Sequence, residues 1–168
     1  MSGGALPAFA GRPVGQIGIV VRDLDEALER YVNELGATPW RCWTYGPRTV
    51  PDLGFRGAPG EYEMRIALWG EAPQVELIEP VRGPSIYHEW LERRGPGLHH
   101  MAVHVPSMED ALAEMAEAGK EPVQWGRGYG ANGDGGFAYF DTVEAFGYYL
   151  ELVEVPSVRI EPERVVEA

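Results

Sequence analysis

The chain is poor in cysteine, in basic residues and in long apolar stretches, and each shortage excludes a class of protein. A single cysteine, Cys42, excludes an intramolecular disulfide and, without a C-x-x-C pair, a thiolate zinc cluster. The 14 basic residues stand against 26 acidic ones, and the net charge of −12 opposes binding to nucleic acid or to an anionic membrane surface. We therefore expect the binding partner to be a small molecule.

Apolar runs long enough for a membrane are missing as well. No stretch approaches the roughly 20 apolar residues that cross a bilayer. The N-terminal sequence MSGGALPAFAGRP lacks the charged start and apolar core of a signal peptide. These features predict a cytoplasmic protein. With 168 residues and 45% hydrophobic content, the chain suits one compact domain or two small modules that share a core.

An internal repeat is the most informative feature that is present. The segment 16–32, QIGIVVRDLDEALERYV, matches 100–116, HMAVHVPSMEDALAEMA, at a constant offset of 84. VELIE at 75–79 matches LELVE at 150–154 at an offset of 75. The repeat predicts two half-domains of one design, related by a pseudo-twofold axis.

The first half has the pattern of a βαβββ unit. An apolar, β-branched strand at 14–21 precedes a helix that Asp23 caps, with Glu26 as its capping partner, and that Gly36 ends. A Pro- and Gly-rich loop at 46–60 separates the first of the later strands from the other two. These strands are expected at 38–45, 62–69 and 74–79.

The second half repeats this order after a connection that contains a short helical stretch at 86–94. Ser107 is a good helix cap, with Asp110 three residues later, and Gly119 ends that helix. Strands that follow each other closely in sequence favour antiparallel pairing. In this half the strands are expected at 98–105, 122–125, 136–141 and 148–154.

We predict an α+β fold in which two βαβββ modules, each with a curved mixed or antiparallel sheet, form a cup. The sequence leaves open whether the modules pair within one chain or swap between the chains of a dimer. The charged C-terminal tail is expected to be peripheral. The expected divisions are an N-terminal extension at 1–13, the first module at 14–80, the connection at 81–97, the second module at 98–156 and the tail at 157–168.

Matching positions of the repeat carry metal-capable side chains, Gln16 against His100 and Glu76 against Glu151. Taken singly, a strand glutamate is more often on the solvent face. A carboxylate on a buried strand face, however, is costly without a cation or a proton. Pseudo-twofold pairing brings the four side chains to one point and so predicts a metal-containing cup. Three oxygens and one imidazole nitrogen suit one divalent ion, namely Zn, Co, Ni, Mn or Fe.

The doubled pattern resembles the vicinal oxygen chelate superfamily, which includes glyoxalase I, methylmalonyl-CoA epimerase, fosfomycin-resistance enzymes, extradiol dioxygenases and bleomycin-binding proteins. The resemblance covers about 14–156 and rests on QIGIVVRDLDEAL, VELIEP, GLHHMAVHV and YLELVE. It implies metal ligands on the first and last strands of each half, at the same four positions. The ligand set is similar to that of zinc-type glyoxalase I, whereas the segment 87–119 resembles the methylmalonyl-CoA epimerase branch.

Other positions distinguish this chain within that resemblance. Glutathione-type glyoxalase I has an arginine four residues after its first ligand and an asparagine four after its second, where this chain has Val20 and Pro80. The epimerase branch has a glutamate base on the third strand, where this chain has Arg65, with Glu63 two residues earlier. The resemblance also implies a homodimer.

We therefore predict a metal-dependent isomerase, epimerase or lyase that removes a proton α to a metal-bound carbonyl of a small acid or an acyl thioester. The metal would stabilise the enolate charge and a carboxylate would carry the proton. Glu151 is the ligand expected to double as the base, and Glu76, His104 and Glu63 are further candidates for proton transfer. The alternative is a small-molecule or drug-binding protein without chemistry, like the bleomycin-resistance proteins.

Several weaker features leave alternatives open. The run GRGYGANGDGG at 126–136 precedes a strand and not a helix, which disfavours a phosphate cradle and leaves a loop at the cavity mouth or a hairpin connection. The loop 47–60 is a substrate lid or a plain connection. His88 and His99 lie off the ligand face, so surface or structural roles are expected. The tryptophans are expected in the core, at positions 40, 43, 69, 90 and 125.

Overall fold

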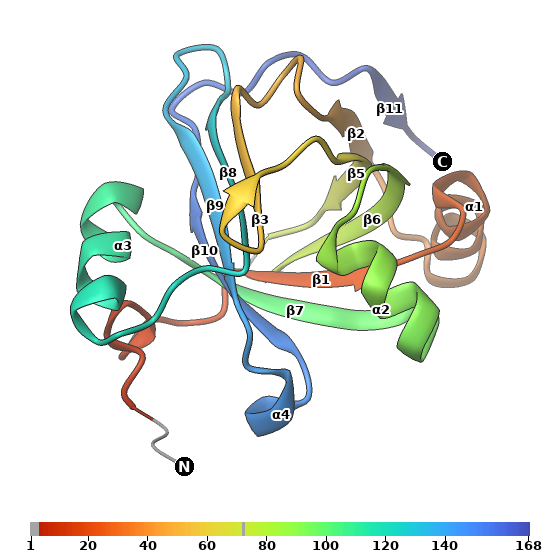
Figure 1. Ribbon diagram of the computed structural model, residues 1–168. Coiled ribbons are helices and arrows are strands. Elements are labelled where there is room, and N and C mark those ends of the chain that lie inside the picture. Colours follow the sequence, from red (N-terminus) through yellow and green to blue (C-terminus); the bar gives the residue numbers. More distant parts are fainter. Residues whose placement is uncertain (1–3, 72) are drawn as a thin grey trace.

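The computed structural model describes residues 4–71 and 73–168, so the first three residues of the expected N-terminal extension lie outside it. Both predicted βαβββ modules are present, and they contribute to one curled mixed sheet. Its strand order is β11-β2-β5-β6-β1-β7-β10-β9-β8-β3-β4. Figure 1 shows β1 and β7 side by side across the middle of the molecule, with one module on either side of them. The predicted fold class is confirmed.

The first module follows the expected order. Its helix begins where Asp23 accepts a hydrogen bond from the backbone N–H of Glu26, and it ends at Gly36 in the left-handed conformation. Strand β1 pairs in parallel with β6, and β6, β5 and β2 pair antiparallel in turn. The elements are β1 (Gln16–Val20), α1 (Leu24–Leu35), β2 (Trp40–Tyr45), β5 (Glu63–Trp69) and β6 (Gln74–Arg82).

The second module has the same arrangement after the connecting helix α2 (Ile86–Arg94). The side chain of Ser107 caps its helix by accepting from the N–H of Asp110. Strand β7 pairs in parallel with β10, and β10, β9 and β8 pair antiparallel. The elements are β7 (Gly97–His104), α3 (Met108–Glu117), β8 (Gln124–Tyr129), β9 (Gly135–Phe140), α4 (Val143–Phe146) and β10 (Tyr149–Glu154).

The two modules join within one chain through the antiparallel pair β1 and β7. In this pair Gln16 lies opposite Ala102, and Gly18 lies opposite His100. Residue 18 corresponds to 102 in the repeat and 16 corresponds to 100, so the two contacts are related by the pseudo-twofold axis. Of the two arrangements that the sequence left open, this chain therefore shows pairing of its own two modules.

Two Gly-rich segments are strands where loops were expected. The expected loop at 46–60 contains the hairpin β3 (Asp52–Phe55) and β4 (Ala58–Pro59), and β3 extends the sheet of the second module by pairing with β8. The first residues of the Gly-rich segment 126–136 belong to β8, and the rest form a short turn that leads to β9. The hairpin connection is thus the correct alternative for 126–136.

The C-terminal tail is not peripheral, and that expectation is wrong. Its residues 156–166, which we call the C-terminal strap, run along the first module and end in β11 (Arg164–Val166). Strand β11 pairs antiparallel with β2 and covers the edge of the sheet (Figure 1). The hydrogen bonds are made by backbone groups, so the charged composition of the tail gave no sign of them.

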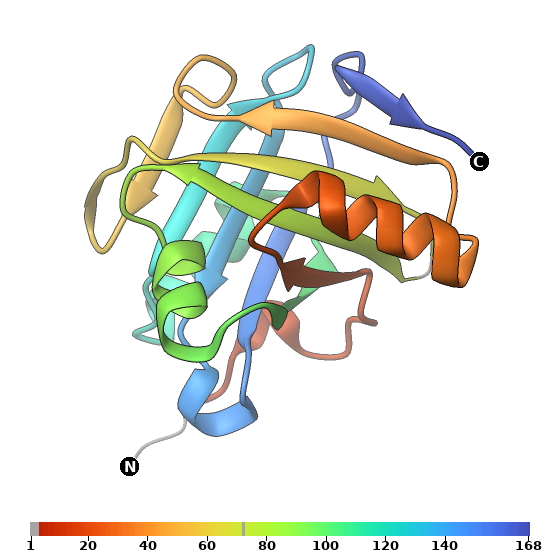
Figure 2. The same ribbon diagram turned by 90° about the vertical axis from the view of Figure 1, so that its right-hand side faces the viewer.

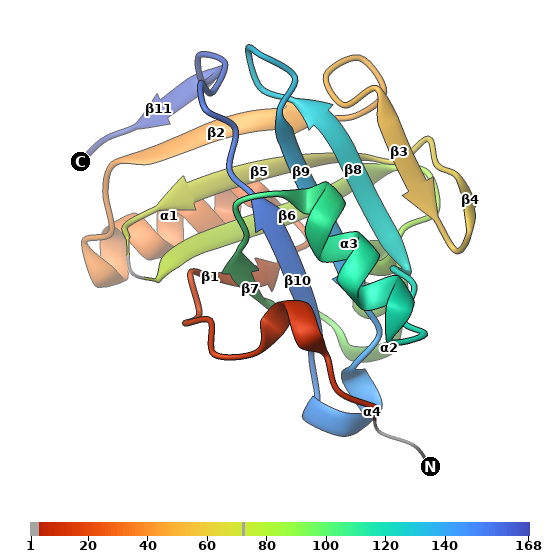
Figure 3. The same ribbon diagram turned by 90° about the vertical axis from the view of Figure 1, so that its left-hand side faces the viewer.

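Helices cover the outer faces of the sheet, and the inner faces of the two modules pack against each other. Helix α1 packs on the outer face of the first module (Figure 2), while α3 and the short 3-10 helix η1 (Pro7–Phe9) lie together on the second (Figure 3). The largest apolar cluster fills the space between the two inner faces and includes residues of α2. Trp40, Trp43 and Trp90 are buried as expected, and Trp69 and Trp125 are partly buried.

The helices within the described ranges are all too short or too polar to cross a bilayer.

Candidate metal centre

Glu76 and His100 lie on either side of Gly18 in one row across the central strands. A Cβ atom at Gly18 would lie only 1.8 Å from Cε1 of His100. Only glycine therefore leaves space for the imidazole to extend over β1 towards Glu76. The sheet register and this glycine together bring a carboxylate and an imidazole from different modules into contact.

The next row repeats this arrangement with the roles of the modules exchanged. Gln16 and Glu151 lie on either side of Ala102. The two rows are separated by two residues along each strand, so their side chains share one face of the sheet. All four predicted ligands thus project from the four central strands, in the order β6-β1-β7-β10, into the interior between the modules.

Three of these side chains converge closely. Glu76, His100 and Glu151 each offer one ligand atom, and these atoms lie within 4.8 Å of one another. The Nε2 atom of His100 is 3.3 Å from Oε2 of Glu76 and 3.1 Å from Oε2 of Glu151. All three residues are buried. Gln16 is buried beside them and donates its amide N–H to Oε1 of Gln74 at 3.2 Å, so its amide oxygen is the atom that could bind a cation.

Two of the converging atoms are left without a hydrogen bond. Nε2 of His100 and Oε2 of Glu151 form an ion pair at 3.1 Å, but among the described residues nothing makes a hydrogen bond of good geometry to either atom. A buried polar atom without a partner costs about 1–3 kcal/mol, and more when it is charged. One divalent ion between them would satisfy both atoms, and imidazole, carboxylate and amide oxygen are ligands that Zn²⁺, Mn²⁺, Fe²⁺, Co²⁺ and Ni²⁺ accept. The residues therefore fit such an ion.

The protonation of the cluster follows from its burial and its charges. Burial lowers the pKa of His100, but the carboxylates of Glu151 and Glu76 outweigh this effect and raise it to about 9. Burial raises the pKa of Glu151, which protonated His100 partly offsets. Without a cation, His100 therefore carries a proton at neutral pH, and a metal ion takes the place of that proton.

His99 contacts the ring of His100 on its Nδ1 side, away from the two glutamates. The register of β7 shifts so that Gly18 pairs with His100 and Ile19 with Leu98, which leaves His99 in a bulge. It is fully buried, and its Nδ1 atom lies 3.0 Å from Nδ1 of His100. Burial, and secondly His100, lower the pKa of His99, which keeps it neutral. The surface role is excluded, and His99 can accept the Nδ1 proton of His100 while Nε2 faces a cation.

The ligands open on a narrow cavity of about 30 Å³, which has space for about one or two water molecules. The hydroxyl of Tyr87 donates to that of Tyr139 at 2.9 Å. Tyr139 lies opposite Glu151 in the register, and its hydroxyl lowers the pKa of that carboxyl group. Other aromatic and apolar side chains complete the wall, namely Tyr45, Met64, Ile66, Leu68, Tyr129, Phe137 and Val153, together with Arg159.

The structure does not bring Glu63 to this cluster. Strand β5 presents Ile66 to the cavity, whereas Glu63 lies against Gly46. Arg65 faces outward and pairs with Asp25 at 3.0 Å. Glu63, a candidate for proton transfer from the sequence, therefore lies away from the cluster, because the side chains of β5 that line the cavity are apolar.

His104 lies near the site but outside the ligand cluster. It is exposed at the end of β7, where its ring contacts Gly15. Partial burial, and secondly the charge of Arg159, lower its pKa. His104 thus lies outside the cluster, on the strand that carries His100.

Arg159 and the tyrosines of the cavity are functional candidates that the sequence did not predict. Tyr139 could have been found, because strand alternation places it on the same face as Phe137 in a strand that the sequence predicts. The position of Arg159 depends on the path of the C-terminal strap, for which the sequence contains no periodic signal.

Comparisons with known proteins agree with this geometry. Residues 15–140 match the model of the Glyoxalase/Bleomycin resistance protein/Dioxygenase superfamily. The uncharacterized protein YqjC of Bacillus subtilis (strain 168) is 28% identical over 138 residues, which cover 82% of this chain and 89% of that protein. The crystal structure of a hypothetical protein from Bacillus halodurans C-125 is 25% identical and covers 90% of this chain and 99% of its own, with a TM-score of 0.62.

Two structures of methylmalonyl-CoA epimerase share the fold. One, in complex with methylmalonyl-CoA and NH4+, is 21% identical with a TM-score of 0.64 and covers 90% of this chain and 99% of its own. The other, from Mycobacterium tuberculosis, is 24% identical with a TM-score of 0.62 and covers 88% of this chain and 93% of its own. The family model spans most of both modules, and the chain belongs to the glyoxalase/bleomycin resistance protein/dioxygenase superfamily.

Proposed function

We propose that the protein is a metal-dependent isomerase, epimerase or lyase that removes a proton α to a carbonyl group of a small acid or an acyl thioester. The convergence of Glu76, His100 and Glu151, with two candidate ligand atoms buried and without a hydrogen bond, carries this proposal. A divalent ion held by these residues and Gln16 would supply Lewis-acid polarisation of the carbonyl.

Glu151 is the residue we propose as the base. It is 3% exposed, and burial raises the pKa of its carboxyl group. A carboxylate whose charged form is disfavoured accepts a proton more readily than one in water. Tyr139, itself bonded to Tyr87, lies opposite Glu151 on the neighbouring strand and lowers the pKa of its carboxyl group, against the larger effect of burial.

Epimerisation requires a second proton carrier on the other side of the substrate, and Glu76 is the candidate. Glu76 comes from β6 and Glu151 from β10, so the two carboxylates approach His100 from opposite sides. His104, exposed on the strand that carries His100, is the further candidate for exchange of that proton with solvent. A lyase needs only one of these carriers.

The cavity wall supports chemistry over simple binding of a large ligand. The aromatic and apolar part of the lining leaves space for only about one or two water molecules and so strengthens the electrostatic interactions within the site. Sites for drug-sized ligands have volumes of roughly 300–1,000 Å³, whereas this cavity has about 30 Å³. It is the size of a reacting group, which disfavours the alternative of a protein that sequesters an aromatic drug.

Exchange of substrate α-protons with deuterated solvent tests the proposal. The metal-loaded protein is incubated in D₂O with a set of small 2-oxo acids and acyl-CoA thioesters, the latter included because of the fold shared with methylmalonyl-CoA epimerase. Mass spectrometry should show deuterium uptake in at least one compound, reduced about 10²- to 10⁴-fold in Glu151→Gln. Glu63→Gln, away from the cavity, is the matched control and should exchange like the wild type. Metal-free protein that binds an aromatic ligand tightly without exchange would contradict the proposal.

A further inference from the structure

The C-terminal strap connects the two modules above the cavity. The carbonyl oxygen of Val158 accepts a hydrogen bond from the N–H of Ala131 in the second module at 2.8 Å. The carbonyl oxygen of Ile160 accepts one from Nε1 of Trp43 in the first module at 3.0 Å. Arg159 lies between these two bonds, so its backbone is fixed on both sides.

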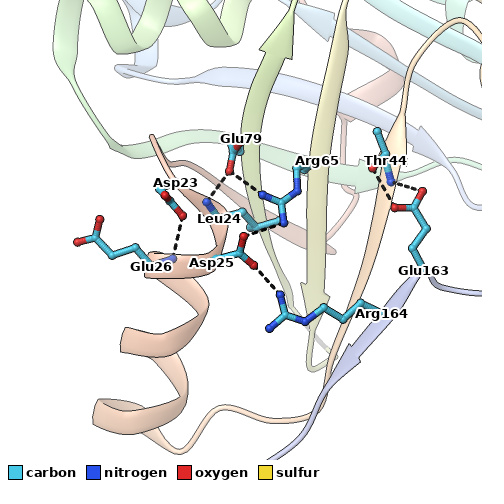
Figure 4. Close-up of polar contacts among 9 residues, drawn as sticks. All are labelled: Asp23, Leu24, Asp25, Glu26, Thr44, Arg65, Glu79, Glu163 and Arg164. Atoms are coloured by element: carbon cyan, nitrogen blue, oxygen red, sulfur yellow. Dashed lines mark hydrogen bonds and ion pairs between the residues drawn. The ribbon is translucent and has the colours of Figure 1, made fainter.

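Further along, the strap is anchored to the outer side of the first module (Figure 4). The carboxylate of Glu163 accepts from the N–H and the hydroxyl of Thr44 at 3.1 and 2.9 Å. Arg164 pairs with Asp25, which also pairs with Arg65 at 3.0 Å. These contacts, with the pairing of β11 and β2, make the strap a fixed part of the fold and hold Arg159 in place.

Arg159 lies where two hollows meet. It lines the inner cavity together with the metal-ligand candidates, and it also lines an outer groove of about 350 Å³. Leu68 is the other residue common to both. The guanidinium carbon lies 5.6 Å from the ring centroid of Trp43, which also lines the groove. The side chains of Arg159 and Leu68 therefore lie between the inner cavity and the outer groove.

The charge of Arg159 is not neutralised by an ion pair with any described residue. The acidic groups that line the two hollows with it are Glu76 and Glu151 inside and Glu161 outside. A divalent ion would balance the two inner carboxylates and leave the positive charge of Arg159 facing the inner cavity. In a chain with a net charge of −12, such a position selects an anion.

We infer that Arg159 determines substrate specificity by binding the carboxylate of a small carbonyl acid whose reacting carbon lies in the inner cavity. The planar guanidinium can bind a carboxylate through two parallel hydrogen bonds. This inference rests on the proposed function and narrows it, because it favours substrates with a free carboxylate close to the reacting carbonyl. The remainder of the substrate would lie in the outer groove.

Binding to the Co²⁺-loaded full-length protein tests the inference without measuring turnover. The probes are 2-oxobutanoate and its uncharged amide, and their affinities are measured by calorimetry and by the visible spectrum of cobalt. Arg159→Gln should weaken the binding of 2-oxobutanoate about 10- to 100-fold, the usual scale for a lost charged hydrogen bond, with little change for the amide. Arg159→Lys should retain part of the affinity. Arg82→Gln, which changes an exposed arginine at the end of β6 that lines neither hollow, should bind both probes like the wild type.

The outcomes separate this inference from the proposed function. Cobalt bound at one ion per chain, with the same affinity for 2-oxobutanoate in Arg159→Gln as in the wild type, would overturn the role of Arg159 alone. An equal loss for both probes would also overturn it, because it would show a structural effect of the strap. Failure of the wild-type protein to bind cobalt would contradict the proposed function and, with it, this inference.

Discussion

Gly18 and His100 lie opposite each other at the junction of the two modules, and a Cβ atom at Gly18 would stand 1.8 Å from the imidazole. The corresponding pair in the other half is Ala102 and Gln16. The flexible side chain of Gln16 can extend past the methyl group of Ala102, whereas the rigid imidazole of His100 needs glycine opposite it. The candidate ligand in each half therefore matches the size of the residue opposite it.

Gly18→Ala should displace His100 from the cluster. We expect metal affinity to fall about 10- to 100-fold or more, the scale seen when ligand orientation is disturbed, and overpacking to lower the free energy of unfolding by about 1–3 kcal/mol. Zn²⁺ titration and urea unfolding measure the two effects. Gly15→Ala is the control, because its Cβ meets the exposed ring of His104, which can turn away. Equal metal affinities in the two variants would refute this role of Gly18.

His99→Phe should weaken metal binding while the histidine ligand itself remains. The substitution removes the acceptor 3.0 Å from Nδ1 of His100, so the ring loses the partner that fixes its orientation. The expected loss of affinity is about 10- to 100-fold. His88→Gln, which changes a histidine bonded to Ser85 at 3.2 Å, should bind metal normally. If competition titrations with a chelator place both variants at wild-type affinity, His99 has no part in orienting His100.

Metal binding should release about one proton per chain at neutral pH. The pKa of His100 is about 9 because the carboxylates of Glu151 and Glu76 outweigh the effect of burial. His100 is therefore protonated below that pH, and affinity should rise about tenfold for each pH unit between about 6 and 8. Calorimetry in buffers with different ionisation enthalpies counts the proton. An affinity that does not change over this range would show that His100 is not a ligand.

The ion pairs of Asp25, which anchor the C-terminal strap, should make the free energy of unfolding depend on pH. The hydrogen bond from Arg65 lowers the pKa of Asp25, burial acts against this, and Arg164 lowers the pKa further. Since the folded state has the lower pKa, the stabilisation is present above the unfolded value of about 3.9 and is lost as the pH falls below it. These groups are largely exposed, so the effect should be less than about 1 kcal/mol. Urea unfolding of the wild type and Asp25→Asn should differ at pH 7 and converge in acid; a difference that persists in acid would contradict this assignment.

The parts of the fold that depend on local sequence could be predicted, and those that depend on distant pairing could not. Asp23, Gly36 and Ser107 are local helix signals, and the helix boundaries followed from them. The hairpin of β3 and β4 could not be predicted because its Pro- and Gly-rich sequence forms strands only by pairing with β8, far along the chain.

The same distinction applies to the site. The four ligand positions came from the repeat, since duplicated strands place equivalent residues around one axis. His99 escaped prediction because a bulge in β7, and not the alternation of the strand, brings its ring to His100. Arg159 escaped because its position depends on a tail held by backbone hydrogen bonds and ion pairs to distant residues.

We propose that one chain holds one divalent ion through Gln16, Glu76, His100 and Glu151. The most direct test is the metal content of the purified protein, measured by mass spectrometry of the elements after saturation with Zn²⁺ and removal of the excess. We expect one ion per chain in the wild type and in Glu63→Gln, and loss of the ion in His100→Ala and Glu151→Ala. A wild-type protein that retains no metal, or a His100→Ala variant that retains it fully, would show that these residues do not form a metal site.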